Sequence, residues 1–277
     1  MIILYCIITF EKTMLDDDGA DRIVFSTVPI DIVKRDRDTD DRIGFGTGFF
    51  YGFNEHLYLV TAKHCFFEAK KEFYPTHFKI ALHLKSRETL REIDFEFINL
   101  YNNNIVNSSN KLWLESNVNT SVDVAAIKLD NNIREKYEIE FFGKGKLLPT
   151  NRALPPAEDL IVVGYPNELY DKHNYLPIFK GASLASVYRT HFNHNPYFLI
   201  DPEQVQGMSG SPVIVKPKNY QFQKNGEMIN ANEIKNRLIG IYTGAFDNQK
   251  LGIVWYSELL QHDIIRYNQK YSWEGFL

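Results

Sequence analysis

The amino-acid sequence predicts an all-β protein. Runs in which apolar and polar residues alternate recur along its 277 residues, and a period of two is the signature of half-buried strands. Aromatic residues are abundant, with 20 Phe and 16 Tyr, as strand-rich proteins prefer. A chain of this length can bury a large core, either as one compact unit or as two fused barrels.

Six runs in the first half of the chain are predicted to be strands. A stretch before the last of them, residues 102–120, is rich in Asn and Ser and is predicted to be a long surface loop. The last run would close a first barrel. The six runs are residues 23–33, 43–53, 56–61, 78–84, 93–97 and 122–129.

The second half repeats this pattern after a linker at residues 131–156, part of which is predicted to be helical around residues 133–137. Ser257 then stands as a predicted N-cap before a short amphipathic helix at residues 258–265. Between linker and helix, the predicted strands are residues 159–163, 181–188, 197–200, 211–215, 236–242 and 251–255.

Charge and the chain's first residues bear on partners and location. The net charge of -4 argues against nucleic acid or an anionic membrane as the main partner. The apolar first ten residues lack a positively charged start and meet Glu11 too soon for a signal peptide or a membrane span. An extra strand or a mis-chosen start codon explains them better. We expect a cytoplasmic protein, with secretion as the alternative.

Three short motifs carry the chemistry. His64 lies in Thr-Ala-Lys-His-Cys at the end of an apolar run, Asp123 opens the apolar run 124–129, and Ser209 lies in Gly-Met-Ser-Gly-Ser-Pro. A serine hydroxyl becomes nucleophilic when an imidazole takes its proton and a carboxylate orients that imidazole. Ser209 is therefore the candidate nucleophile, His64 the candidate base and Asp123 the residue that orients it.

The glycines around Ser209 suit this role. They allow a tight turn from which the hydroxyl projects and in which backbone amides converge. The amides of Gly207 and Ser209 would form an oxyanion hole.

These motifs resemble those of the trypsin/chymotrypsin-like serine peptidases, nearer the bacterial glutamyl-endopeptidase and HtrA-type branch than the digestive enzymes. Residues 46–50 (Gly-Thr-Gly-Phe-Phe), 164–166 (Gly-Tyr-Pro) and 239–245 also resemble segments of that family. The resemblance spans residues 23–261. It implies two packed six-stranded antiparallel β-barrels with a short C-terminal helix, and a serine endopeptidase that works without cofactor or metal.

The implied organisation has five parts. The first barrel would carry His64 and Asp123, and the second would carry Ser209. No PDZ domain is expected after the helix, so a partner protein could supply targeting or regulation. The parts are an extension at residues 1–20, the first barrel at 21–135, a linker at 136–157, the second barrel at 158–256, and the helix and tail at 257–277.

The family pattern also assigns supporting positions. The Thr243 hydroxyl would support Asp123. Met208 stands where digestive enzymes carry the Asp that pairs with a freshly cut N-terminus. No such activation is expected, and Arg22-Ile23-Val24 is interpreted as a plain first strand. Cys65 lacks the half-cystine partner of secreted relatives, because residues 46–48 contain none. It is expected to be a buried thiol, with a disulfide to Cys6 as the alternative.

The substrate pocket is less defined by the sequence. Glu203 aligns with the acid at the base of the trypsin pocket, which would favour a basic residue at the cleaved position, although it could equally face solvent in a loop. Tyr242 stands where glutamyl-specific relatives have a histidine, so that preference is not expected. The remaining pocket positions are Thr243, Gly244, Ala245 and Gly252.

Four other interpretations stay open or are set aside. An esterase could use the same triad, and a protease-like binding module could keep the fold without turnover. His191 and His194 are interpreted as loop histidines, because no second ligand pair matches them. The acidic run 36–40 lacks the Gly and Glu of a calcium loop.

Overall fold

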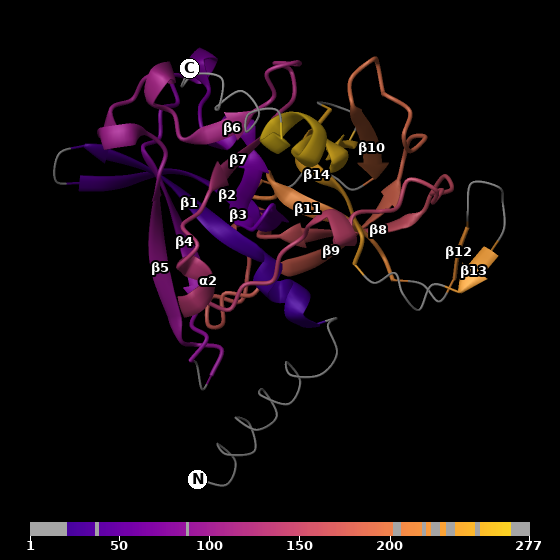
Figure 1. The fold of residues 1–277 in the computed structure, drawn as a ribbon, viewed down its shortest axis with the longest axis horizontal. Helices are drawn as coiled ribbons and strands as arrows, with labels where there is room; N and C mark the ends of the chain where they lie inside the picture. Colours follow the sequence, from indigo (N-terminus) through magenta and orange to yellow (C-terminus); the bar gives the residue numbers. More distant parts are fainter. Residues whose placement is uncertain are drawn as a thin grey trace, which may run out of the picture.

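The computed structural model confirms the predicted all-β class, with two β units side by side (Figure 1). The structure describes residues 21–36, 39–86, 89–201, 206–217, 220–222, 228–230, 236–246 and 250–266. Within these ranges, no helix is long and apolar enough to cross a membrane.

The first unit is a seven-stranded antiparallel sheet in the order β5-β4-β1-β2-β3-β7-β6. One face of the sheet encloses a core that includes Ile30, Phe50, Leu59 and Phe78, all fully buried. β5 alternates between less and more exposed residues, as a period of two predicts. β3 and β7 are instead buried along nearly their whole length, because residues from both of their faces belong to core clusters. Their bounds are β1 Thr27–Asp36, β2 Thr39–Phe53, β3 His56–Ala62, β4 His77–His83, β5 Ile93–Asn99, β6 Trp113–Glu115 and β7 Val124–Lys128.

The second unit is a closed six-stranded barrel in the order β10-β15-β14-β11-β8-β9. Closure leaves no free edge, so every strand of this unit has two neighbours. A separate two-stranded ribbon joins β12 to β13. The bounds are β8 Asp159–Gly164, β9 Ile178–Leu184, β10 Tyr197–Asp201, β11 Ser211–Val215, β12 Tyr220–Phe222, β13 Met228–Asn230, β14 Leu238–Ala245 and β15 Gly252–Tyr256.

Short helices connect these strands. The predicted linker helix is present as α2 (Ile133–Lys136), and the helix after the second barrel is a π-helix, η8 (Leu260–Ile265). The Ser257 hydroxyl does not cap it, because that hydroxyl donates to the carbonyl of Leu238. The 3₁₀ turns are η1 Asp21–Ser26, η2 Lys63–Cys65, η3 Ala69–Lys71, η4 Asn102–Asn104, η5 Ser108–Asn110, η6 Lys144–Lys146 and η7 Pro166–Glu168.

Three predictions differ from the structure. The Arg22-Ile23-Val24 stretch is not strand but part of η1, where the Ser26 hydroxyl donates to the Ile23 carbonyl and closes the turn. The predicted loop at residues 102–120 contains β6, which pairs with β7. The β12–β13 ribbon was not predicted at all. These last three strands have three residues each, too few to display a period.

A second core lies at the seam between the two units. The other faces of β2 and β3, with Phe49 and Val60, pack against Val163 and Ile241 of the barrel and against Ile264 of η8. Tyr51 in β2 accepts a buried hydrogen bond of 2.7 Å from Gln261 in η8. The seam is therefore packed and bonded, and it positions residues of one unit against the other.

Candidate active site

β3 and β7 bring His64 and Asp123 together. These strands are antiparallel, and Ala62 pairs with Val124, so the residues just beyond this pair lie side by side. One carboxylate oxygen of Asp123 accepts from the His64 backbone amide at 2.9 Å, and the other lies 2.7 Å from His64 Nδ1. This two-point contact fixes the imidazole orientation and leaves its Nε2 side for another partner.

The surroundings of His64 favour its charged form. Burial lowers the pKa of the imidazole, but the neighbouring Cys65 sulfur and the Asp123 carboxylate outweigh burial, and the net effect raises the pKa of His64. A base with a raised pKa binds a proton more strongly than a free imidazole does. His64 is thus a stronger proton acceptor than histidine in water.

The turn that carries Ser209 requires its glycines. Gly207 has φ of +83° and Gly210 has φ of +91°, both in the left-handed region. A Cβ on Gly207 would lie 2.4 Å from the Tyr165 carbonyl oxygen, and a Cβ on Gly210 would lie 2.1 Å from that of Thr47. Only glycine fits at either position, so the sequence Gly-x-Ser-Gly is a direct consequence of this turn.

Ser209 lies at the seam, close to the segment that carries His64. Its carbonyl accepts from the Thr47 amide at 2.9 Å. A Cβ at Gly46 would contact both the Cys65 sulfur and the Ser209 carbonyl oxygen, at 3.3 and 3.4 Å. The residue after His64 and the backbone of Ser209 therefore flank the same glycine.

The Ser209 hydroxyl donates to the carbonyl of Thr243 at 3.2 Å. Among the residues that the structure describes, no hydrogen bond joins this hydroxyl to His64. For His64 to act as the base, the hydroxyl would first have to turn from the Thr243 carbonyl. Bonds between nucleophile and base are often loose without substrate, so this arrangement is compatible with a resting site.

Thr47 is a connecting residue that the sequence analysis did not single out. Its fully buried hydroxyl donates to the Gly207 carbonyl at 2.7 Å and accepts from the Tyr165 amide at 3.1 Å. Its own carbonyl accepts from the Thr61 hydroxyl at 2.7 Å. The only signal in the sequence is its place in Gly-Thr-Gly, which specifies a strand but not these bonds.

Two supporting residues have different outcomes. Met208 is 2% exposed and packs in the barrel core, so no carboxylate faces a chain terminus there. For Thr243, the hydroxyl accepts from Trp255 Nε1 at 3.1 Å, and no hydrogen bond to Asp123 occurs within the described ranges, so its support of Asp123 stays a prediction. A register shift in β14 between Tyr242 and Gly244 accompanies this orientation.

The predicted pocket residues lie on neighbouring strands. Ala245 of β14 pairs with Gly252 of β15, and a Cβ at Gly244 would meet no atom within 4 Å. On Gly252, a Cβ would lie 2.7 Å from the Tyr242 ring, so this ring fills the space beside that glycine. Glu203 lies outside the described residues.

Cys65 is a free, buried thiol at 2% exposure, as expected. Cys6 lies outside the described residues. No group of three His, Cys, Asp or Glu side chains that could hold a metal ion occurs in the part of the chain that the structure describes.

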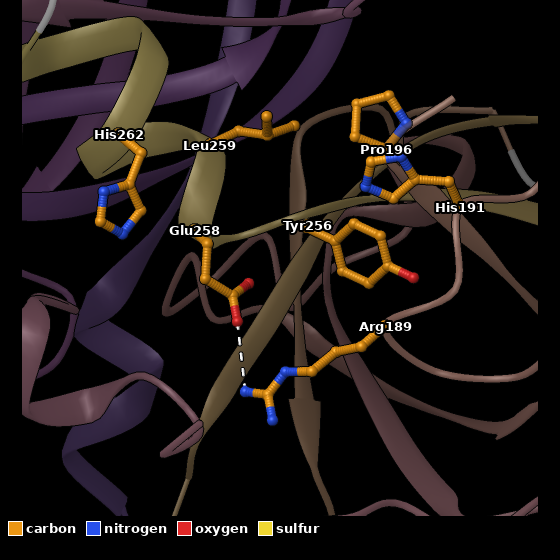
Figure 2. Close-up of a pocket in the computed structure, with 7 residues that line it drawn as sticks. All are labelled: Arg189, His191, Pro196, Tyr256, Glu258, Leu259 and His262. Carbon is orange, nitrogen blue, oxygen red and sulfur yellow. Dashed lines mark hydrogen bonds and ion pairs between the residues drawn. The ribbon is translucent and has the colours of Figure 1, made fainter. Parts of the chain in front are cut away.

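A separate cavity of about 250 Å³ lies beside η8 (Figure 2). Its Arg189 donates to the carbonyls of residues 148–150 and 152 and pairs with Glu258 at 3.3 Å. Arg189 thus ties the linker to the end of the barrel. His191 lines this cavity, and none of the three candidate catalytic residues does. The full lining is Arg189, His191, Pro196, Tyr256, Glu258, Leu259 and His262.

Comparisons with known proteins identify the family. No curated protein matches the chain. Two solved structures are similar in fold. The serine endoprotease from Yersinia pestis has 13% identity and a TM-score of 0.48, and the match covers 88% of this chain and 65% of that one. An inactive mutant form of Rv3671c from M. tuberculosis has 14% identity and a TM-score of 0.41, and the match covers 86% of this chain and 84% of that one. This chain therefore spans less than two thirds of the Yersinia protein.

The family model for the trypsin-like peptidase domain matches residues 46–218, which is more than half of the sequence. The match takes in His64, Asp123 and Ser209. The chain belongs to the trypsin-like peptidase family.

Proposed function

We propose that this chain is a serine endopeptidase that uses His64, Asp123 and Ser209 as its triad. The observation that carries the proposal is the two-point contact between Asp123 and His64 beside a turn whose glycines admit no other residue. Such an arrangement fixes two glycines in the left-handed region and orders a carboxylate against an imidazole, which a plain structural turn does not need.

The first half of the reaction forms an acyl-enzyme. The Ser209 hydroxyl turns from the Thr243 carbonyl, its oxygen attacks the carbonyl carbon of the peptide bond, and His64 Nε2 takes the proton. The amides of Gly207 and Ser209 hold the oxyanion of the tetrahedral intermediate. The C–N bond then breaks, and His64 returns the proton to the leaving amine.

Water completes the cycle. His64 takes a proton from a water molecule, whose oxygen attacks the acyl carbon. The second tetrahedral intermediate collapses, the bond to Ser209 breaks, and the hydroxyl regains its proton from His64. The carboxylic acid product leaves. Asp123 stays ionised throughout and stabilises the imidazolium.

A fluorophosphonate probe tests the proposal, because an unactivated serine does not react with it. We expect labelling of the native chain, and Ser209→Ala should abolish labelling and lower kcat by a factor on the order of 10⁶. Ser211→Ala is the matched control, because Ser211 lies two residues further on and is fully buried, and among the described residues its hydroxyl bonds only to the Met208 sulfur at 3.8 Å. Absence of labelling in the native chain would leave a binding module as the better interpretation.

Substrate preference and location remain predictions. Equal cleavage of peptides with Arg or Lys and with neutral residues at the cleaved position would contradict the prediction of an acidic pocket around Glu203. Turnover of esters without turnover of peptides would favour the esterase alternative. The cytoplasmic location and a regulatory or targeting partner are further proposals, supported by sequence alone.

A further inference from the structure

The outer face of the first sheet carries a row of side chains that do not resemble an ordinary solvated surface. Strand register places Phe97 of β5 beside Lys79 of β4, Lys79 beside Asp31 of β1, and Asp31 beside Phe45 of β2. Directly opposed side chains on one face of a sheet are in contact distance. The row therefore crosses four strands on the face opposite the core.

Aromatic rings from the second unit extend this row. Measured between ring centroids, Tyr170 stacks on Phe45 at 6.4 Å, and Tyr175 lies 5.6 Å from Tyr170. The Tyr175 ring in turn lies 5.9 Å from Phe95 of β5, which returns the row to the first sheet. We call the set Phe45, Tyr170, Tyr175, Phe95 and Phe97 the aromatic belt. Phe95 and Phe97 are 41% and 45% exposed, so the belt is open to solvent at its far end.

Cations lie over the belt. The Lys79 ammonium is 4.4 Å from the Phe95 ring centroid and 5.8 Å from that of Phe97. Arg42 lies over Phe45 at 5.1 Å, but Asp31 and Glu168 neutralise it. Lys79 lies opposite Asp31 and acts electrostatically on Asp40, but among the described residues it makes no ion pair, so its ammonium can still contact a carboxylate from outside.

The belt begins at the candidate active site. A Cβ on Gly207 would lie 3.2 Å from the Phe45 ring, so the first ring of the belt adjoins the proposed oxyanion turn. The belt ends at β5, which is the outer strand of the sheet and lies away from the barrel (Figure 1). Three strand spacings separate Phe45 from Phe97, which is about 14 Å, or about four extended residues.

The outer edge of β5 can also bind a backbone. One amide of β5, that of Phe95, already donates to the Asp94 side chain at 2.8 Å. Within the described ranges, no backbone segment pairs with the outer edge of this strand. A seven-residue edge strand with exposed Phe side chains and no proline is a site where an extended chain can add.

We propose that the aromatic belt is a second binding surface for the polypeptide substrate, which takes an extended segment with acidic and aromatic residues several positions from the scissile bond. The proposal rests on the proposed peptidase function. The rings would hold aromatic side chains, and Lys79 would hold a carboxylate. Nucleic acid is disfavoured as the ligand, because both arginines of this face are already paired with carboxylates: Arg35 with Asp40, and Arg42 with Asp31 and Glu168.

Binding is tested first, without turnover. Fluorescein-labelled poly(Glu,Tyr) is titrated against the Ser209→Ala chain and followed by anisotropy. We expect saturable binding, weakened at least tenfold by Phe97→Ser combined with Lys79→Glu, and by a smaller factor with Phe97→Ser alone. Val118→Ser is the control, because Val118 is 74% exposed and follows β6 at the opposite edge of the sheet. Equal binding by all variants, no binding, or tighter binding of labelled oligothymidylate would overturn the proposal.

Turnover is tested next, with casein as an unfolded acidic substrate. We expect the double variant of Phe97 and Lys79 to raise KM about tenfold, with kcat and fluorophosphonate labelling unchanged. An unchanged KM in a chain that still labels and cleaves would overturn the belt alone. A native chain that neither labels nor cleaves would overturn the peptidase function instead, and the binding titration would then show whether the surface exists apart from it.

Discussion

Thr47 offers a quantitative test of how the oxyanion turn is held, through substitution by valine. Val has nearly the same shape, so Thr47→Val removes a hydroxyl and little volume. The change leaves the Gly207 carbonyl and the buried Tyr165 amide without their partner, at 2.7 and 3.1 Å in the native chain. A buried orphan costs about 1–3 kcal/mol and a half-buried one less, so unfolding should become easier by about 2–4 kcal/mol.

Thr27 supplies a matched control one strand away. It is also a buried β-strand threonine, at 2% exposure, and its hydroxyl has no hydrogen-bond partner in the described part of the chain. Thr27→Val should therefore be neutral or slightly stabilising, because an unpaired buried hydroxyl is removed. The difference between the two variants isolates the bonds of Thr47 from the general effect of the substitution.

Urea unfolding measures the stability difference, and initial rates of fluorophosphonate labelling measure the site. Thr47→Val should also slow labelling by about 10-fold or more, because the Gly207 carbonyl that it releases belongs to the turn of the proposed oxyanion donors. Equal urea midpoints for the two valine variants would refute the reasoning. Labelling at the native rate in a destabilised Thr47→Val chain would separate stability from catalysis and refute the second step.

The remaining predictions concern titration, charge and the seam. Because the pKa of His64 is raised above 6.5, kcat/KM should be lost as pH falls through a value above 6.5. Cys65→Ala should move the midpoint of this loss to lower pH, and an unchanged midpoint would contradict the contribution of Cys65 to the raised pKa. Met208→Asp should lower the free energy of unfolding in urea by about 3–5 kcal/mol, since the described residues of its buried cluster are apolar and offer no partner charge, whereas Met208→Leu should cost under about 1.5 kcal/mol. Tyr51→Phe should lower the free energy of unfolding by about 1–2 kcal/mol, because it removes the bond to Gln261. Tyr188→Phe should leave it unchanged, because the Tyr188 hydroxyl has no partner among the described residues. Similar losses in both variants would argue against the bond between Tyr51 and Gln261.

The strands were predictable where they are long and half-buried. β5 shows the alternation in its burial as well as in its sequence. The second half of β2 is buried on both faces, because Phe50 packs in the first core while Phe49 and Tyr51 pack at the seam. β6 has only three residues inside an Asn-rich stretch, and its pairing with β7 is a tertiary contact that no local pattern encodes. The first turn of η1 was mistaken for strand because Ile23 is buried at the seam rather than on a sheet face.

The site was predictable for a different reason. The glycines of the Ser209 turn are steric requirements, so they appear in the sequence as a fixed motif. Hydroxyl groups leave no such trace, because a threonine can bond in several directions without changing its neighbours. This is why Thr47 was missed and why Thr243 was assigned to Asp123 although it bonds to Trp255.

The bond between Tyr51 and Gln261 has a consequence for biosynthesis. η8 packs in the same core cluster as Val124, which follows Asp123, so the last described helix braces the strand that positions the proposed base. A ribosome makes this helix after every other part of the seam. A nascent chain therefore lacks this brace, and we expect the proposed pairing of Asp123 with His64 to be held in place only after η8 has left the ribosome.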